Sequence, residues 1–404
     1  MVLENLPVLM VDNRIVSVRP LDEIVIKDLE LEWLTVGENE EYLSNEFLQM
    51  TAKEVDALRD ASEITYRILL KAAEHAVQQG EWKLLGIPPH AIDLVKYSLT
   101  NEMDTHLLGR FDFSGGMDGV PIKLLEINAD TCSLLAETAY IQEQQWKQDE
   151  DKLKGSPYNP LIEELIVRFR RIINQNPDRD PTLLISTLGY EEDWINADVV
   201  AEAAREAGFE EVESAILERV IFSPEEGIFL EEDDGAFVRY DFWYKFIPWD
   251  FIAYEEPGLF DDLEKLIIDQ KVVVLNPAYT MLLQSKALLK YAYDLYPESP
   301  YLLKTTFSAA DFPDHKYVAK PIYGRMGENI SFYDGEPEPV YKTEGDYDDL
   351  PVVYQELAPF NFDLEGHRYQ PSIFWTGLPS GLCFRRQDDL IIDDDAEFVG
   401  HVVG

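Results

Sequence analysis

The chain is poor in cysteine, in basic residues and in long apolar runs. Only two of its 404 residues are cysteines, and Cys132 and Cys383 lie far apart, so a disulfide framework is not expected. The 34 basic residues face 78 acidic ones, giving a formal net charge of −44. This charge argues against nucleic acid or an anionic membrane as the main partner. It is compatible with a cationic substrate such as a polyamine, although an acidic, solubilising surface is the commoner explanation.

Several familiar signals are also missing. No apolar run approaches the length that spans a bilayer, and Glu4 stands where a signal peptide would carry positive charge. The chain has no Walker A sequence and no dinucleotide-binding GxGxxG that opens a helix. Together with the scarcity of cysteine, these absences predict a soluble, cytoplasmic protein without a membrane partner.

The residues that are present predict a globular α/β chain. Apolar residues make up 46% of it, and its length allows two or three domains with substantial cores. Residues 1–50 alternate apolar and acidic positions, which predicts strands of an edge element or of a small subdomain. From Thr51 to Val77 apolar residues recur at three- and four-residue steps, and Glu54 completes a capping box, which predicts a long helix.

The pattern changes after segment 152–160, whose glycine and prolines mark a candidate linker. Beyond it the predicted elements are a helix at 161–173, a buried strand at 182–187 and a helix at 197–207. Alternating strands and helices predict a parallel sheet with ligands near the loops that follow its strands. The loop 189–193 is acidic at Glu191 and Glu192, which suits an amine, although charges at a helix start are the commoner explanation.

A predicted hairpin carries the polar side chains that most clearly indicate a functional site. A strand at 107–113, a turn with three glycines and a strand at 120–127 bear polar groups at alternate positions: Arg110, Asp112, Glu126 and Asn128. Oxygen ligands from Asp, Glu and Asn suit Mg²⁺, which commonly brings substrate phosphates as further ligands. A hairpin with a merely solvent-exposed polar face explains the same pattern, and both interpretations stay open at this point.

The residues after this hairpin predict a helix start capped by Thr131 or Ser133. Free backbone N–H groups there make a natural seat for a carboxylate or phosphate. Cys132 lies at the same point and has to be considered as a nucleophile, but a small buried thiol explains it as well.

A second glycine-containing segment, 324–329, follows the apolar strand that ends in Lys320. Its backbone N–H groups could close over phosphates, with Lys320 and Arg325 supplying positive charge. Lys286 lies on a predicted helix after a buried strand and an Asn-Pro turn. The aromatic segment 240–251 is expected to be core or the wall of a pocket.

The set of these segments is more specific than any one of them, and it resembles the glutathionylspermidine synthase family, whose synthetase domains are ATP-grasp ligases. The resemblance extends from about residue 110 to the end. It rests on the segments RFDF, LEINADTCSLLAE, WYKFIPWD, LNPAYTMLLQSKALL, VAKPIYGRMGENIS, VYQELAPF and FRRQDDLI, in the order of the family.

The resemblance implies roles for individual residues. The positions that match the Mg²⁺ ligands of the family are Asp112, Glu126 and Asn128. Those that match arginines near the transferring phosphate are Arg110 and Arg385. The nucleotide positions are Lys286 and Lys320, Gly324 and Gly327 of the loop, and Gln355, Glu356 and Leu357 at the adenine hinge. The acid-substrate positions are Thr131 and Ser133, and the amine positions, more loosely matched, are Glu191 and Glu192.

The resemblance also implies an α/β fold with α+β elements: an ATP-grasp fold in permuted order, with an inserted Rossmann-like substrate-binding domain. The implied divisions are 1–155 with the metal-binding hairpin, 156–272 as the inserted domain, and 273–404 with the lysines and glycine loop. The metal ligands precede the lysines, an order that the family shares. The amidase domain of bifunctional members is not matched, so hydrolysis of the product is not expected. Arg386 stands where the family usually has an acidic residue, which would add charge beside Arg385.

The predicted function is an ATP- and Mg²⁺-dependent ligase that joins a peptide-like acid, such as glutathione, to an amine or polyamine through an acyl phosphate. A non-catalytic nucleotide- or peptide-binding protein that keeps the fold is the main alternative. A phosphotransferase that stops at a phosphorylated product is a third possibility, and the sequence leaves the oligomeric state open.

Overall fold

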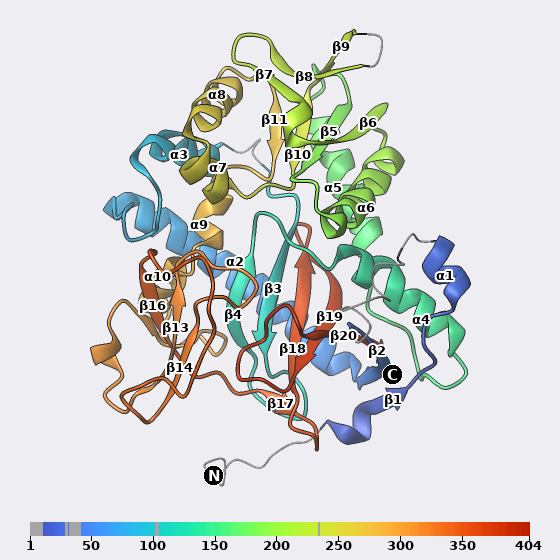
Figure 1. Cartoon of the computed structure of the whole chain (residues 1–404), viewed down its shortest axis with the longest axis vertical. Helices are drawn as coiled ribbons and strands as arrows, with labels where there is room; N and C mark the ends of the chain where they lie inside the picture. Colours follow the sequence, from blue (N-terminus) through green and yellow to red (C-terminus); the bar gives the residue numbers. More distant parts are fainter. Residues whose placement is uncertain (1–10, 29–30, 32–41, 102–104, 233–234) are drawn as a thin grey trace.

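The computed structural model of the chain describes residues 11–28, 31, 42–101, 105–232 and 235–404. Over these residues the chain forms four sheets with helices packed around them, a mixed α/β architecture as predicted. Figure 1 shows a central sheet, a second sheet with its helices above it, and a third sheet to the left of the central one.

The central sheet has the strand order β1-β2-β20-β19-β18-β3-β4, with β17 paired to β18. These strands are β1 (Ile15–Ser17), β2 (Leu43–Met50), β3 (Gly109–Ser114), β4 (Lys123–Asn128), β17 (Asn361–Phe362), β18 (Arg368–Trp375), β19 (Pro379–Gln387) and β20 (Glu397–Val403). Pairing is antiparallel except between β2 and β20. The second and the last described strands, β2 and β20, therefore lie side by side.

One face of the central sheet packs against the long helix α2 (Ala52–Gln79), which runs behind it in Figure 1. Phe111 and Ile373 of the sheet share a buried cluster with Leu58 and Leu69 of α2. The helix begins at the predicted capping box, in which Thr51 and Glu54 bond each other's backbone N–H. The polar residues of β3 therefore point to the opposite face.

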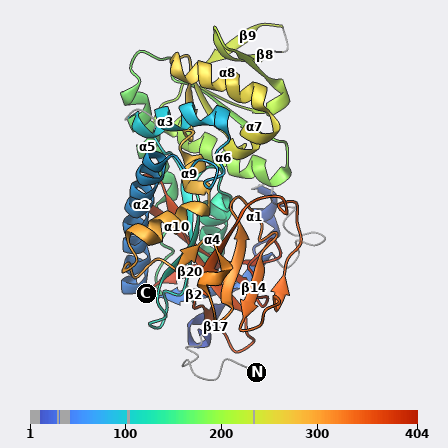
Figure 2. The same cartoon turned by 90° about the vertical axis from the view of Figure 1, so that its left-hand side faces the viewer.

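The second sheet is parallel, with the order β11-β10-β5-β6. Its strands are β5 (Thr182–Thr187), β6 (Glu211–Ile216), β10 (Phe242–Lys245) and β11 (Val273–Leu275). Its helices are α5 (Leu161–Gln175) and α6 (Glu191–Ala207) on one side, and α7 (Trp249–Glu255) and α8 (Pro257–Ile268) on the other (Figure 2). A small antiparallel sheet is attached to it, formed by β7 (Val220–Ser223), β8 (Gly227–Glu231) and β9 (Phe237–Tyr240).

The third sheet is antiparallel, with the order β12-β16-β13-β14-β15. Its strands are β12 (Thr305–Thr306), β13 (Lys316–Pro321), β14 (Ser331–Asp334), β15 (Tyr341–Lys342) and β16 (Val352–Glu356). Helices α9 (Thr280–Gln284) and α10 (Ala287–Leu295) precede it in the chain, and α3 (Ile92–Thr100) and α4 (Gln142–Gln148) complete the longer connections.

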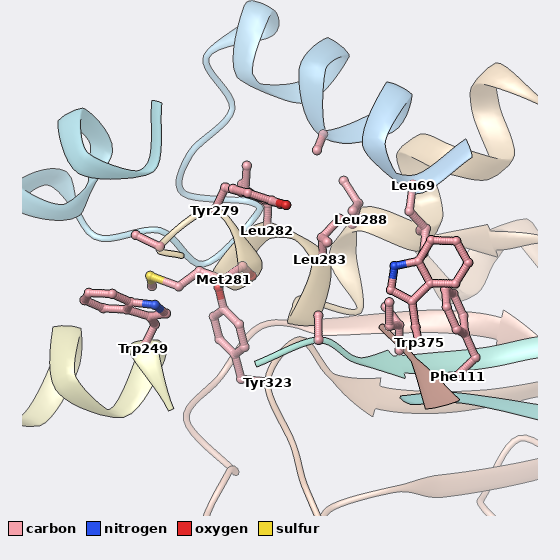
Figure 3. Close-up of a cluster of buried hydrophobic side chains, with 14 of the residues drawn as sticks. Leu69, Phe111, Trp249, Tyr279, Met281, Leu282, Leu283, Leu288, Tyr323 and Trp375 are labelled. Atoms are coloured by element: carbon pink, nitrogen blue, oxygen red, sulfur yellow. Dashed lines mark hydrogen bonds between the residues drawn. The ribbon is translucent and has the colours of Figure 1, made fainter. Parts of the chain in front are cut away.

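The short helix α9 lies where the three main sheets meet. In Figure 3 Met281 of α9 lies beside Trp249 and Tyr323, and Leu283 points toward Phe111 and Trp375. Trp249 comes from α7, Tyr323 from the segment after β13, and Phe111 and Trp375 from the central sheet. Buried apolar contact at this point positions the sheets around the polar face of β3 and β4.

Some sequence predictions need correction. Residues 23–28, expected to be strand, form the helix α1 (Glu23–Asp28), because a short alternating pattern also suits one apolar side of a helical turn. Segment 152–160 is not a free linker, since Val403 of β20 donates to the carbonyl of Ser156 at 2.9 Å. The part of the edge prediction that covers residues 1–10, 29–30 and 32–41 lies outside the described residues.

Among the described helices, none combines the length and apolar character needed to cross a membrane.

Candidate active site

The hairpin of β3 and β4 brings its four polar side chains together, as the alternation of its residues predicts. In the antiparallel register Arg110 lies opposite Asn128, and Asp112 lies opposite Glu126. The turn between the strands depends on glycine. At Gly115, where φ is +74°, an added Cβ would lie 2.2 Å from the carbonyl oxygen of Pro121.

Arg110 and Asp112 form a buried, bidentate ion pair. The two nitrogen–oxygen distances are 2.8 and 2.9 Å. Asn128 and Ser372 donate to the same carboxylate at 2.8 and 2.7 Å. Burial disfavours the charge of Arg110, but Asp112 outweighs it and raises the pKa of Arg110 further. This part of the site is therefore held rigidly before any ligand binds.

Glu126 joins the hairpin to two buried lysines. Lys286 Nζ lies 3.0 Å from Glu126 Oε2 and donates to the carbonyl of Gly324 at 2.8 Å. Burial by itself raises the pKa of Glu126, but Lys286 and Lys320 outweigh it, so the net pKa is lowered. Lys286 does not lie within a helix as predicted. It is the N-cap residue of α10, because the chain leaves helical geometry at Ser285.

Lys320 lies on β13 and donates to Gln355 Oε1 of the neighbouring β16 at 2.9 Å. Burial, together with the positive charge of Lys286, lowers the pKa of Lys320 to about 8. An anionic ligand would favour the protonated ammonium, since it would supply the negative charge that this buried group lacks.

A cleft of about 1130 Å³ lies between the third sheet and the hairpin. Its lining contains every residue that the resemblance assigned to the nucleotide, together with Glu126: Lys286, Lys320, Gly324, Gly327, Gln355, Glu356 and Leu357. Apolar side chains, including Val318, Phe332 and Ile391, line it as well. Buried lysines together with apolar side chains suit a ligand with phosphates and an aromatic base.

The predicted acid-binding turn lies beside the hairpin, but its capping differs from the prediction. Neither Thr131 nor Ser133 caps the helix, which begins at Leu135. The N–H of Leu135 is satisfied instead by Asn196 Oδ1 of α6 at 2.9 Å. Ser133 is exposed, and Arg110 donates to its carbonyl at 3.0 Å and to its hydroxyl at 3.4 Å. The hydroxyl of Ser133 therefore lies beside the guanidinium group.

A buried ion pair that the sequence analysis missed anchors this turn. Lys245 of β10 and Asp130 are both shielded from solvent, with Nζ and Oδ1 2.7 Å apart. Trp249 N–H donates to the other oxygen of Asp130 at 2.6 Å. The signal was available, since a lysine within the apolar segment 240–251 needs a buried partner, but the sequence does not say which one.

Asn276, at the predicted Asn-Pro turn, is a second anchor. Its side-chain oxygen accepts from the N–H groups of Leu107 and Leu108 at 2.8 and 3.1 Å. Its side-chain nitrogen donates to the carbonyls of Leu108 and Asp130, both at 2.8 Å. The start of β3 and the end of β4 are thus tied to one buried amide.

The acidic residues Glu191 and Glu192 form the first turn of α6 rather than a loop, because the helix begins six residues earlier than predicted. Burial raises the pKa of Asp193 to about 7, and the charge of Glu192 adds to the effect. Burial also raises the pKa of Asp394 to about 6, again assisted by Glu192. Acidic groups from α6 and from the segment before β20 therefore lie within electrostatic reach of one another.

The adjacent residues Arg385 and Arg386 point to opposite faces of the central sheet. Arg385 donates to the carbonyls of Asp393 and Ala396 at 2.6 and 3.2 Å. Arg386 forms ion pairs with Glu46 and Glu397. The expectation that Arg386 adds charge beside Arg385 is therefore wrong, because successive side chains of a strand alternate.

Arg325 of the glycine loop also has a partner outside the loop. It forms an ion pair of 2.6 Å with Asp250 in the first turn of α7. Gly327 lies against the segment before β20, where an added Cβ would approach Asp393 Cβ to 2.8 Å. The loop therefore contacts two other parts of the site.

Cys132 is a buried thiol rather than a nucleophile. Burial raises its pKa to about 12, so the thiolate is not formed near neutral pH.

Within the described part of the chain, no three His, Cys, Asp or Glu side chains are grouped to hold a metal ion. The expected set is of a different kind, with two carboxylates and the amide of Asn128. Asp112 already accepts two hydrogen bonds at each carboxylate oxygen, from Arg110 and Ser372 at Oδ1 and from Arg110 and Asn128 at Oδ2. The side-chain oxygens of Asp112, Glu126 and Asn128 are of the kind that Mg²⁺ prefers, so the set fits Mg²⁺ in its chemistry, and Asp112 would exchange one of these hydrogen bonds for the ion.

Comparison with known proteins gives several relatives. The chain is 26% identical to a putative acid–amine ligase of Haemophilus influenzae, over 87% of this chain and 88% of that protein. It is 27% identical to the bifunctional glutathionylspermidine synthetase/amidase of Escherichia coli, over 72% of this chain and 48% of that protein. A trypanothione synthetase of Crithidia fasciculata is 26% identical over 63% of this chain and 40% of that protein. The chain thus spans less than half of the last two relatives.

Among solved structures, a glutathione synthetase-like effector of Globodera pallida matches 90% of each chain, with a TM-score of 0.54 and 11% identity. This likeness concerns the fold alone. The family model described as glutathionylspermidine synthase preATP-grasp matches residues 13–404. The chain therefore belongs to the glutathionylspermidine synthase family.

Proposed function

We propose that the protein is an ATP-dependent ligase that forms an amide between a carboxylic acid and an amine through an acyl phosphate. The observation that carries this proposal is the position of Glu126. It lies opposite Asp112 on the hairpin and 3.0 Å from Lys286, at the edge of the cleft. The same carboxylate thus belongs both to the expected metal site and to the expected phosphate site.

The nucleotide half of the site would use two lysines and one loop. Lys286 and Lys320 would neutralise the phosphates of ATP, and Gly324–Asn329 would cover them. The backbone of Glu356 and Leu357 at the end of β16 would meet the base, against the apolar wall of the cleft. Mg²⁺, held by Asp112, Glu126 and Asn128, would supply further positive charge for the transferring phosphoryl group.

The acid half of the site would use the turn after β4. Thr131 and Ser133 would orient the substrate carboxylate, and Arg110 lies next to Ser133, where charge develops during phosphoryl transfer. The carboxylate oxygen would bond to the γ-phosphorus while ADP leaves. The amine nitrogen would then bond to the acyl carbon, while phosphate leaves and the amine releases a proton. Arg385 would assist only after giving up contacts with the segment 393–396.

The fold supports the finer architecture that the family suggests. We propose a permuted ATP-grasp unit, in which the metal ligands of the hairpin precede the lysines in the chain. The parallel sheet of residues 182–275 would be the inserted substrate-binding part. The division at residues 155 and 272 stays a prediction.

The substrates are proposed from the relatives and from charge. Relatives named for glutathionylspermidine and trypanothione synthesis suggest a peptide-like acid such as glutathione and a polyamine. The acidic groups Glu191, Glu192 and Asp394 offer negative charge for a cationic amine. These contacts would complement a polyamine electrostatically.

The proposal is tested by measuring ADP release with panels of acids and amines. The unmodified protein should release ADP only when both an acid and an amine are present. Glu126→Ala should lower that rate by about 10³-fold or more, since an electrostatic group at the transferring phosphate is lost. Glu46→Gln, which alters an ion pair on the opposite face, should keep the full rate.

Two results would favour other functions. No substrate-dependent ADP from the unmodified protein would point to a non-catalytic binding protein. ADP release that needs the acid but no amine would point to a phosphotransferase.

A further inference from the structure

The first turn of α7 contacts both halves of the site through two consecutive residues. Trp249 N–H donates to Asp130 Oδ2 at 2.6 Å, and Asp130 directly precedes the acid-binding residue Thr131. The next residue, Asp250, accepts from Arg325 of the glycine loop at 2.6 Å. One helical turn therefore contacts the acid-binding turn on one side and the phosphate loop on the other.

The Asp250–Arg325 contact is better shielded than an ordinary surface ion pair. The Asp250 side chain is 9% exposed and that of Arg325 is 25% exposed. Asp250 raises the pKa of Arg325 although burial opposes its charge. A partly buried, charge-assisted hydrogen bond contributes more than an exposed pair, whose contribution is often small.

Two further contacts of the loop are with the third sheet. Thr343 donates to the carbonyl of Gly327 at 2.6 Å, and Tyr347 N–H donates to Asn329 at 2.8 Å. Both partners follow β15, which pairs with β14 of that sheet. Over the residues that the structure describes, the Arg325–Asp250 pair is the one ion pair between the loop and the helices of the parallel sheet.

We propose that Asp250 is a positioning residue that holds the glycine loop closed against the acid-binding turn and so couples the ATP and acid sites. This inference rests on the proposed ligase function. An occupied acid site stabilises the turn at Asp130, which keeps Trp249 and Asp250 aligned with Arg325. The closed loop then keeps water from the phosphorylated acid.

Loss of the Asp250–Arg325 contact would allow water to hydrolyse the acyl phosphate. Water oxygen would bond to the acyl carbon while the bond from that carbon to the phosphate oxygen breaks. Free acid and phosphate would form, with the released proton passing to solvent. ATP would then be consumed without formation of an amide.

The test uses trypsin, because Arg325 is itself a cleavage site when it is accessible. Asp250→Asn in the full chain should be cleaved after Arg325 at least about tenfold faster than the unmodified protein, the change expected for one lost charged hydrogen bond. Mass spectrometry of the fragment 1–325 measures this rate. The same variant should release more than one ADP per amide, whereas the unmodified protein should release about one.

Two further variants keep the test decisive. Glu46→Gln removes a charge from a partly buried arginine pair outside the site, and it should change neither the cleavage rate nor the ADP-to-amide ratio. Arg325→Lys keeps the positive charge and the trypsin site but not the guanidinium geometry, and it should be cleaved at a rate above that of the unmodified protein. Arg325→Lys also serves if Asp250→Asn does not fold.

Cleavage of Asp250→Asn at the unmodified rate would overturn the inference, as would equal effects of Asp250→Asn and Glu46→Gln. If Asp250→Asn does not fold, the inference would be overturned by Arg325→Lys being cleaved no faster than the unmodified protein. Absence of any substrate-dependent ADP release by the unmodified protein would count against the ligase instead. The cleavage rates need no catalysis, so they would still decide whether Asp250 holds the loop.

Discussion

The hairpin half of the site, formed by β3 and β4, is held by several buried contacts within one sheet, whereas the loop half depends on fewer contacts between separate elements. Asp112 accepts from three side chains, and the end of β4 is tied to Asn276. Among the residues that the structure describes, one ion pair, Arg325–Asp250, links the loop at 324–329 to the helices of the parallel sheet. From this difference we expect the proposed metal and acid positions to be preorganised, and the loop to open when the proposed nucleotide binds.

The largest expected effect is a difference in stability between variants of the two hairpin carboxylates, Asp112 and Glu126. Asp112→Asn leaves the buried charge of Arg110 without its ion pair, so the free energy of unfolding should fall by about 3–5 kcal/mol. Glu126→Gln should cost less, about 1–2 kcal/mol, because the Glu126 side chain is 29% exposed and the buried Lys286 keeps its hydrogen bond to the carbonyl of Gly324. Denaturant unfolding of both variants measures the contrast. Equal losses would mean that the buried Arg110–Asp112 pair contributes no more to stability than the contact between Glu126 and Lys286.

The second effect concerns the charge of Lys320, whose pKa is lowered to about 8. Below pH 8 the ammonium of the free protein is charged and attracts phosphate, whereas above it the group becomes neutral. ATP should restore the proton, so its Kd should rise by up to about tenfold per pH unit above 8. Calorimetric titration in buffers of different ionisation enthalpy should show proton uptake on binding at pH 8–9.

A matched variant isolates this lysine. Lys320→Arg keeps a positive charge throughout that range, so its affinity for ATP should vary little with pH. An unchanged pH dependence in Lys320→Arg would assign the titration to another group.

The smallest expected effect tests the loop half. Gly327→Ala combines a φ of +70° with a Cβ only 2.8 Å from Asp393 Cβ. It should cost about 1 kcal/mol of stability and raise the KM for ATP several-fold, because the loop can no longer close fully. Steady-state kinetics with varied ATP measure the second effect.

Gly335→Ala is the control, since Gly335 has a φ of +90° but no atom within 4 Å of an added Cβ. Gly335→Ala should lower the free energy of unfolding, because of its positive φ, without raising the KM for ATP. Identical kinetics for the two variants would contradict a role for the contact at Asp393.

Several features of the fold follow from local pattern. The capping box of Thr51 and Glu54, the end of α6 at Ala207 and the hairpin register were all predictable, because they depend on neighbouring residues or on the two-residue period of a strand. The start of α6 and the cap at Leu135 were not predictable. Asn196, which satisfies the N–H of Leu135, is 61 residues away in the chain.

The sequence by itself determined which oxygen and nitrogen groups share one face of the hairpin, since alternation along a strand is a local property. The resemblance added the lysines and the glycine loop, and all of these line one cleft with Glu126. Only the tertiary structure decided how the two halves are joined. Asp130 meets Lys245 across 115 residues of chain, and Asp250 meets Arg325 across 75. Such partners are chosen by the packing of remote elements, because a buried charge must be paired but its own sequence neighbourhood does not specify the partner.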